Sequence, residues 1–297
     1  MKPVSLKLTA ILLIFFFSGA AGLAYEIVWA RQLSLIFGVS IYAVSAVLVA
    51  FMAGLGIGAE FFGRKLNQGA APIRLYALLE IVLGIYVLLF PLIFKLLETF
   101  YLVLHPGAIS VSFYVIVLRF ALAVSALIIP TILMGGTLPA LARFFSEYES
   151  DAGRLTGKLY AVNTLGAMAG CFAAGFWMIE HLGLSGTLRA GAVINIMVGV
   201  LAWITASEPK WWQETKAEQK KTKKIQKKFH EHKWDLTLLL LFGVSGFSAL
   251  ALEVLWTRML ILLLNNTTYA FSLILSVFLF GIGSGSALIH YVIRKSA

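Results

Sequence analysis

The chain has 297 residues, of which 60% are hydrophobic and 13% are charged, and its mean hydropathy is +0.90. A soluble globular domain is about half apolar and about a quarter charged, so this composition excludes a disordered chain, a coiled coil and an ordinary soluble enzyme. The formal net charge is +10, and the single cysteine, Cys171, excludes a disulfide framework or a site with several cysteine ligands. We therefore expect a membrane protein whose apolar surface faces lipid.

Eight apolar stretches are long enough to cross a bilayer as helices, for which about 20 mostly apolar residues are needed. Helices are expected because lipid offers no hydrogen-bond partners to an open backbone, and no alternation typical of a barrel is present. In chain order, the predicted spans are Thr9–Trp29, Ile41–Phe61, Leu75–Leu96, Phe113–Leu133, Tyr160–Ile179, Ala190–Ala206, Leu236–Trp256 and Tyr269–His290. The sequence thus predicts an all-α, polytopic transmembrane helix bundle of about eight helices.

Lysine and arginine are concentrated on one side of the predicted membrane. If the N-terminus is inside, most of the 24 basic residues fall near the two termini, in the loops after the second and fourth spans, and in segment 207–234. The positive-inside rule then predicts a multi-pass membrane protein with both termini in the cytoplasm. Segment 207–234 is expected to be a basic cytoplasmic linker or an amphipathic helix on anionic lipid, so its charge indicates membrane lipids as partners and no nucleic acid.

An internal repeat is the most informative feature, because residues 15–58 align without a gap on residues 242–285. Six spans separate the starts of the two copies, so the copies are expected to be parallel, as in the two halves of major-facilitator transporters. On that plan, residues 1–206 form a first six-helix half, residues 207–234 a linker, and residues 235–297 the first two helices of a second, incomplete half. Identical pairs include Glu26/Glu253, Trp29/Trp256, Arg31/Arg258, Gly54/Gly281, Gly56/Gly283 and Gly58/Gly285.

The repeated motif Glu-x-x-Trp-x-Arg supplies the main candidate site. Ionisable residues inside a membrane span are costly unless they are paired or hydrated. One interpretation is a pair of carboxylates that binds a cationic substrate, with the tryptophans adding cation–π contacts. The other is anchoring of tryptophan and arginine at the membrane interface. The residues concerned are Glu26, Trp29, Arg31, Glu253, Trp256 and Arg258.

The fourth span contains four residues that weaken a helix: Pro130, Gly135, Gly136 and Pro139. Proline removes a backbone donor and clashes with the preceding turn, so we expect a helix break or hinge here. In transporters such breaks often lie at a binding site, whereas an ordinary structural kink is the alternative.

Three further polar residues fall inside apolar spans. Asn163, beside the small-residue pair Gly166 and Gly170, is expected either to line a substrate cavity or to lock two helices together. Glu80 and Arg119 lie at depths that their long side chains can bridge, so we predict an intramembrane ion pair between them. No cofactor motif and no cluster of metal ligands is visible, so the sequence predicts neither a cofactor nor a metal site.

Three signatures occur in order along the chain and carry a family resemblance. With them the chain resembles, over nearly its whole length, the membrane region of the fused major-facilitator/spermidine-synthase-like membrane proteins of bacteria. The resemblance implies a cytoplasmic domain similar to a polyamine aminopropyltransferase, but that domain and its catalytic residues do not occur in these 297 residues. The signatures are Ser18-Gly19…Tyr25-Glu26-x-x-Trp29-x-Arg31, Met134-Gly-Gly-Thr-Leu-Pro139 and Leu159-Tyr-Ala-x-Asn-Thr-Leu-Gly166-Ala.

Two functional hypotheses follow. The first is a transporter-like membrane module that binds or moves a small cationic, polyamine-related solute. The second is a non-transporting membrane anchor or scaffold for a soluble aminopropyltransferase-like enzyme or another subunit. An enzyme acting by itself is the least expected, because no nucleophile–base or metal constellation is visible.

Overall fold

The computed structural model describes residues 3–37, 40–104, 113–145, 152–205, 236–264 and 267–296. Nearly all of these residues are helical and none is in a strand, so the predicted all-α bundle is confirmed. The linker predicted at 207–234 lies outside the described ranges. The elements are α1 (Pro3–Phe37), α2 (Ser40–Asn67), α3 (Pro72–Leu104), α4 (Phe113–Gly135), α5 (Thr137–Phe145), α6 (Ala152–Ala173), the π-helix η1 (Ala174–Met178), α7 (Ile179–Thr205), α9 (Leu236–Leu264) and α10 (Thr267–Ser296).

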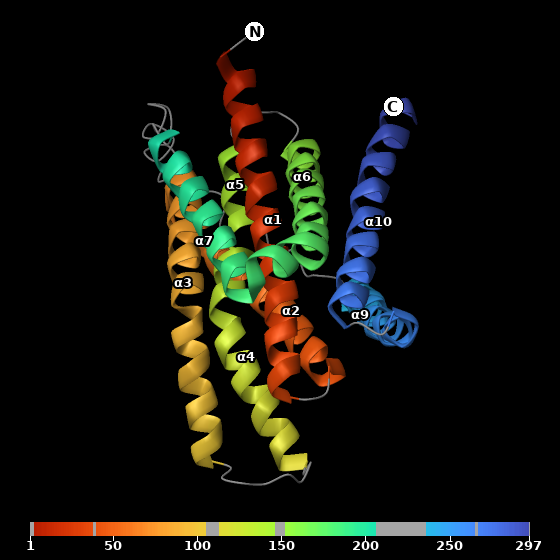
Figure 1. Cartoon of the computed structure of the whole chain (residues 1–297). Helices are drawn as coiled ribbons and strands as arrows, with labels where there is room; N and C mark the ends of the chain where they lie inside the picture. The colour runs from red at the N-terminus through yellow and green to blue at the C-terminus, as the bar shows by residue number, and fades with distance from the viewer. Residues whose placement is uncertain are drawn as a thin grey trace.

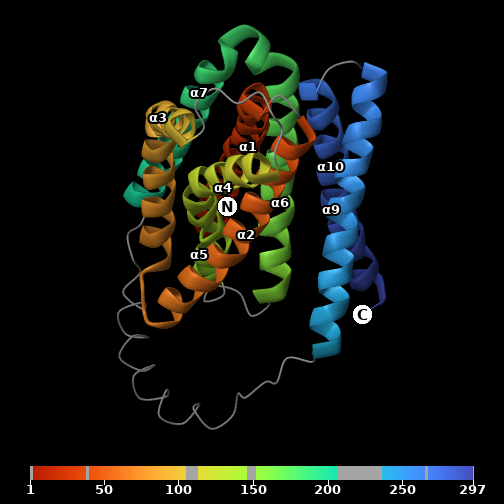
Figure 2. The same ribbon diagram turned by 90° about the horizontal axis from the view of Figure 1, so that it is seen from below.

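Seven continuous helical segments of the described chain are long and apolar enough to cross a membrane, and one of them, Thr156–Thr205, has 50 residues. A straight helix of that length would measure roughly 75 Å, whereas the hydrocarbon core of a bilayer is about 30 Å thick. The segment bends at Gly183, where φ is 69° and ψ is 176°. Glycine adopts this conformation without a Cβ clash. The chain therefore forms a multi-pass bundle in which α6 and α7 run as separate helices (Figures 1 and 2).

Three helix pairs form the body of the molecule: α1 with α6, α2 with α4, and α3 with α7. Each pair has glycines at its contact. A methyl group on Gly170 would overlap the backbone of α1, one on Gly58 the backbone of α4, and one on Gly199 side-chain and backbone atoms of α3. Small residues let helices approach closely in membranes, where packing replaces the hydrophobic effect. The first six predicted spans thus make a closely packed unit.

The second copy of the repeat, α9 and α10, stands at the side of this body (Figures 1 and 2). Helix α10 packs against α6, whereas α9 packs mainly against α10. Large apolar side chains of α9 face outward, and Leu263 is 80% exposed. Helix α9 is seen almost end-on in Figure 1 and at full length in Figure 2, so it runs across the direction of α1.

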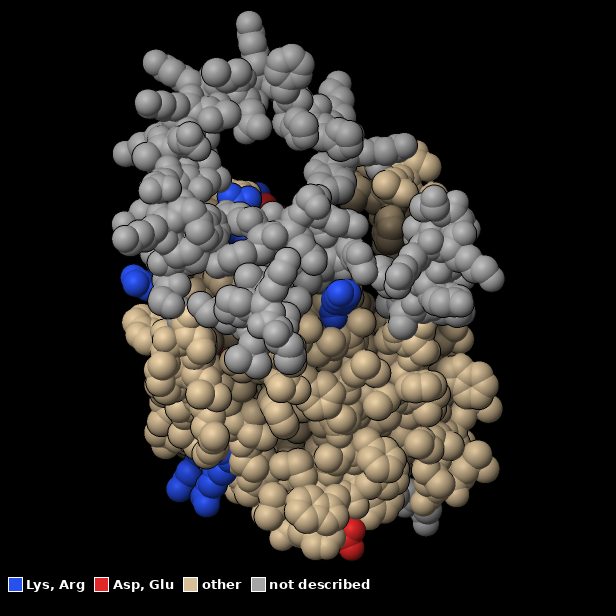
Figure 3. Space-filling view, turned by 90° about the horizontal axis from the view of Figure 1, so that it is seen from above, with Lys and Arg blue, Asp and Glu red and all other residues tan. Residues whose placement is uncertain are grey.

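The start of α1 and the end of α10 lie at the same end of the bundle (Figure 1). Which end faces the cytoplasm stays a prediction. Figure 3 looks onto this end of the bundle, and few charged side chains of the described part are visible there. Among the described residues, three charged side chains are buried: Glu26, Glu80 and Glu253. Buried charges in a membrane span are candidates for function, so these three define the sites described below.

Candidate functional site

The first buried carboxylate, Glu80, ties together α1, α3 and α7. Ser18 of α1 donates its hydroxyl to Oε1 of Glu80 at 2.5 Å, and the side-chain amide of Asn195 in α7 donates to Oε2. The hydroxyl of Tyr25 donates to Oδ1 of Asn195, and Tyr76, one turn before Glu80, is fully buried beside it. We call these five residues the Glu80 network. Each oxygen of its carboxylate has a donor, as buried polar groups require.

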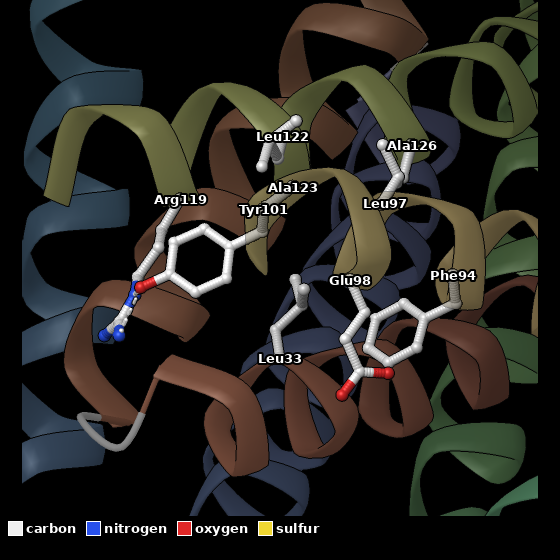
Figure 4. Close-up of a pocket in the computed structure, with 9 residues that line it drawn as sticks. All are labelled: Leu33, Phe94, Leu97, Glu98, Tyr101, Arg119, Leu122, Ala123 and Ala126. Carbon is white, nitrogen blue, oxygen red and sulfur yellow. Dashed lines mark hydrogen bonds between the residues drawn. The ribbon is translucent and has the colours of Figure 1, made fainter. Parts of the chain in front are cut away.

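The ion pair predicted between Glu80 and Arg119 is wrong. Nε and Nη2 of Arg119 donate to the hydroxyl of Tyr101 at 3.0 and 2.8 Å, and the guanidinium lies 5.2 Å from the centre of the Tyr101 ring. Figure 4 shows this arrangement at the edge of a small, mainly apolar hollow, with Glu98 directed away from Arg119. A similar depth in the membrane was not enough to predict an ion pair, because the rotation of each helix about its axis decides which neighbour a side chain contacts.

The other two buried carboxylates are repeat equivalents that the structure brings together. Glu26 of α1 is 3% exposed and Glu253 of α9 is 4% exposed. They lie near enough for negative charges on them to repel each other. Both also act on Cys171 of α6, whose thiol donates to the backbone oxygen of Ser272 in α10 at 3.4 Å. The carboxylates of the two copies thus lie around Cys171 of α6, beside the contact between α6 and α10.

These two carboxylates lack the donors that Glu80 has. Among the described residues, Oε1 of Glu26 and Oε1 of Glu253 are buried without a hydrogen-bond partner. The hydroxyls of Thr257 on α9 and of Ser272 and Ser276 on α10 are buried and unpaired in the same way, although Ser276 lies beside the Cys171 thiol. We call Glu26, Glu253, Thr257, Ser272 and Ser276 the paired-acid cluster. Its oxygens could all accept hydrogen bonds or coordinate a positive charge.

The π-helix η1 shapes one wall of the paired-acid cluster. A methyl group on Gly175 would overlap the side chain of Ser272, so the backbone of η1 lies directly against α10. One residue further along, Phe176 stacks on Tyr269 of α10, with 5.2 Å between the ring centroids and 5° between the planes. Short π-helical turns inside α-helices are frequent at functional sites. This one holds α10 close to α6 at the cluster.

A small hollow lies beside the cluster, between α1, α2 and α10. Its lining includes Ile27, which follows Glu26 in the chain, and Phe271, which precedes Ser272. Further along α1 it is lined by Arg31 and by Ser34, whose hydroxyl donates to the backbone oxygen of Arg31 at 2.8 Å. The hollow is therefore a neighbour of the cluster, and neither carboxylate is part of its lining.

The two tryptophans of the repeated motif have different surroundings. Trp29 is fully buried in an aromatic core, 5.0 Å from the ring centre of Phe90 and 5.5 Å from that of Tyr25. Trp256 is 56% exposed on α9, and Arg258 is exposed as well. The two tryptophans therefore do not form a symmetric pair of cation–π contacts, and they do not both anchor the protein at the membrane interface. The motif is duplicated in sequence, but only its carboxylate is buried in both places.

Asn163 contributes to helix packing. A methyl group on Gly19 would overlap the backbone and side-chain oxygens of Asn163, so this residue lies in the contact between α1 and α6. Glu26 is two turns further along α1. This position agrees with one of the two expectations for Asn163, namely that it locks two helices together.

A helix break lies where the fourth span has its prolines and glycines. Helix α4 ends at Gly135 and α5 begins at Thr137, with Gly136 between them. A methyl group on Gly135 would overlap the backbone of α2, and one on Gly136 would meet side chains of α2 and α3. Pro130 lies within α4, and Pro139 falls in the first turn of α5, where a missing donor is tolerated. These residues line neither hollow described above, so the break serves packing, and a hinge role stays a prediction.

Sequence reasoning assigned no role to several polar residues of the two sites, Tyr76 among them. Ser272 carried a signal, because it aligns with Ser45 in the repeat. Asn195 carried another, as a side-chain amide inside the apolar sixth span. Thr257 and Ser276 carried none, because single hydroxyls are common in apolar helices.

No family model matches the chain, and neither a curated protein nor a solved structure matches it. Its function therefore has to be argued from the chemistry of the site.

Proposed function

We propose that this protein is a transporter-like membrane module that binds a small cationic solute at the paired-acid cluster. The observation that carries the proposal is the meeting of Glu26 and Glu253, one from each copy of the repeat, with buried oxygens that lack donors. Two carboxylates in an apolar interior cannot both stay charged unless protons or a positive ligand neutralise them. A cation bound there would contact both copies at once and so would depend on their relative position, as alternating access requires.

We further propose that the chain is the membrane region of a fused major-facilitator/spermidine-synthase-like protein of a bacterial inner membrane, with both termini in the cytoplasm. The three motifs of the first, fourth and fifth spans support this. A polyamine-related solute suits the proposal in two ways: it carries the positive charge that the carboxylates need, and it is the class of molecule that an aminopropyltransferase-like partner would handle.

The proposal is tested by reconstituting the full chain in liposomes and measuring binding and uptake of radiolabelled spermidine. We expect the unmodified protein to bind spermidine and the double variant Glu26→Gln/Glu253→Gln to lose that binding. The matched control is Glu60→Gln, because Glu60 is an exposed residue of α2 that pairs only with the neighbouring Arg64. Equal binding and uptake by the double variant would contradict the proposal.

The second candidate function is a non-transporting anchor or scaffold. The observation behind it is the position of α9, which packs mainly against α10 and leaves Phe247 and Leu263 exposed to lipid or to another membrane subunit. The partner that we propose is a soluble aminopropyltransferase-like enzyme or another membrane subunit. Absence of both cation binding and flux, together with purification of an identified enzyme at a fixed ratio to this chain, would favour the scaffold.

A further inference from the structure

We propose that the paired-acid cluster binds a hard metal cation of the alkali or alkaline-earth class through oxygen ligands. This inference rests on the proposed ligand-binding role of Glu26 and Glu253, and it adds the chemical class of the ligand. The sequence predicted no metal site, because it contains no group of carboxylate, imidazole or thiol ligands at the spacing of a metal motif. Hydroxyl ligands on separate helices produce no such pattern.

The proposed ligand atoms come from three helices, of which α10 packs against both α1 and α9. Glu26 comes from α1, Glu253 and Thr257 from successive turns of α9, and Ser272 and Ser276 from successive turns of α10. Each of the five side chains is more than nine-tenths buried, and each has an oxygen without a hydrogen-bond partner among the described residues. Four buried hydroxyls of the described part lack a hydrogen-bond partner, and three of them belong to this cluster; the fourth is that of Tyr76. Unpaired buried hydroxyls are rare, so three of them beside two unpaired carboxylates need a common explanation.

Cys171 is the neighbour that shows these groups to be close together. Its thiol contacts the backbone of Ser272 at 3.4 Å and lies beside the hydroxyl of Ser276. Charges on Glu26 and Glu253 act on the same thiol and on each other. The two carboxylates and the two serines therefore lie around one side chain of α6, and Thr257 follows Glu253 by one turn of α9.

The ligand atoms select the class of metal. Carboxylate and hydroxyl oxygens suit hard cations such as Na⁺ and Ca²⁺, whereas zinc and copper prefer nitrogen and sulfur. No group of three His, Cys, Asp or Glu residues that could hold a metal occurs in the described part of the chain. The thiol of Cys171 already donates to a backbone oxygen. Mg²⁺ fits less well, because it demands a near-ideal octahedron and retains several waters.

The geometry also favours a compact ion over an extended organic cation at the carboxylates themselves. The hollow beside the cluster is lined by Ile27, Ala30 and Phe271 among others, and neither carboxylate is part of its lining. A dehydrated ion needs only the space between ligand oxygens, whereas a polyamine needs a cavity as long as its chain. A divalent ion would neutralise both carboxylates, and a monovalent ion would neutralise one and leave a proton on the other.

The test uses the full chain in detergent and follows thermal unfolding through its seven tryptophans. NaCl, CaCl₂ and MgCl₂ are titrated in separate arms against choline chloride at constant ionic strength, and spermidine forms a further arm. A specific ion stabilises the folded state until its site saturates, so we expect the unfolding midpoint to rise and level off with Na⁺ or Ca²⁺. In Ser272→Ala and Thr257→Val we expect at least about tenfold weaker apparent affinity for that ion, with no loss of stability in choline.

Ser284→Ala is the matched control, because Ser284 also lies on α10 but is exposed and donates to the backbone of its own helix. A response to spermidine without any response to Na⁺ or Ca²⁺ would overturn this inference and leave the proposed function standing. No response to either would overturn both. A metal response that persists unchanged in Glu26→Gln/Glu253→Gln would also overturn the inference, whereas a metal response that this variant abolishes supports it even if spermidine has no effect.

Discussion

The bundle contains two clusters of buried acids that differ in their hydrogen bonds. Both oxygens of Glu80 receive a donor, from Ser18 and from Asn195, within the first six spans. Glu26 and Glu253 come from different copies of the repeat, and each has an oxygen without a donor. A satisfied acid holds its helices in one arrangement, whereas an unsatisfied pair is stabilised only when something positive joins it. We therefore interpret the Glu80 network as structural and the paired-acid cluster as the site.

The largest effect expected from this difference is the loss of Glu80. Glu80→Ala leaves the hydroxyl of Ser18 and the amide of Asn195 buried without their acceptor, so we expect the free energy of unfolding in detergent to fall by about 3 kcal/mol. Glu60→Ala, at an exposed position, is expected to change it by less than about 0.5 kcal/mol. Equal stability of the two variants would remove the structural role that we assign to Glu80.

A smaller effect is expected for one donor of the same network. Ser18→Ala removes a hydrogen bond to a carboxylate that keeps its second donor, and such a bond contributes about 1.5 kcal/mol. Unfolding in detergent is the measurement, and binding of spermidine or of a metal ion should not change. If Ser18→Ala altered ligand binding as strongly as a change at Glu26, the two clusters would have to be regarded as one site.

The paired acids are expected to behave in the opposite way. Removing the charges in Glu26→Gln/Glu253→Gln relieves their repulsion, so stability without ligand should stay the same or rise by up to about 1 kcal/mol. The ligand-dependent rise of the unfolding midpoint should disappear at the same time. A loss of stability as large as that of Glu80→Ala would show that this pair is also structural.

The smallest effect on stability is expected for Ser272, and it is compared with the effect of the same change at Ser18. Ser272→Ala removes a buried hydroxyl that has no partner, so its stability without ligand should differ from that of the unmodified chain by no more than about 0.5 kcal/mol. The measurement is the same unfolding experiment, carried out beside Ser18→Ala. If Ser272→Ala were the more damaging of the two, the hydroxyl of Ser272 would have a partner that the paired-acid cluster does not include.

Hydropathy was enough to predict the apolar helices, because it depends on which residues occur and at what spacing, and the repeat singled out Glu26 and Glu253 as a candidate pair. Contacts that depend on helix rotation were not predictable in this way. Arg119 lies at a suitable depth for Glu80, yet it meets Tyr101, and Glu80 meets Asn195 from a helix more than a hundred residues away. Trp29 and Trp256 share a motif but not an environment, because α1 is enclosed and α9 lies at the edge.

The most direct test of the account is whether positions 26 and 253 lie together in the membrane. Cys171 is the only cysteine, so Cys171→Ala gives a cysteine-free background for Glu26→Cys combined with Glu253→Cys. We predict that a short bifunctional thiol reagent joins these two positions within one chain, as detected by mass spectrometry of the digested protein. A control pair, Glu60→Cys with Glu253→Cys, should not be joined. If both cysteines react with a monofunctional reagent but are never joined to each other, the two copies of the repeat do not meet at their carboxylates, and the proposed site would be contradicted.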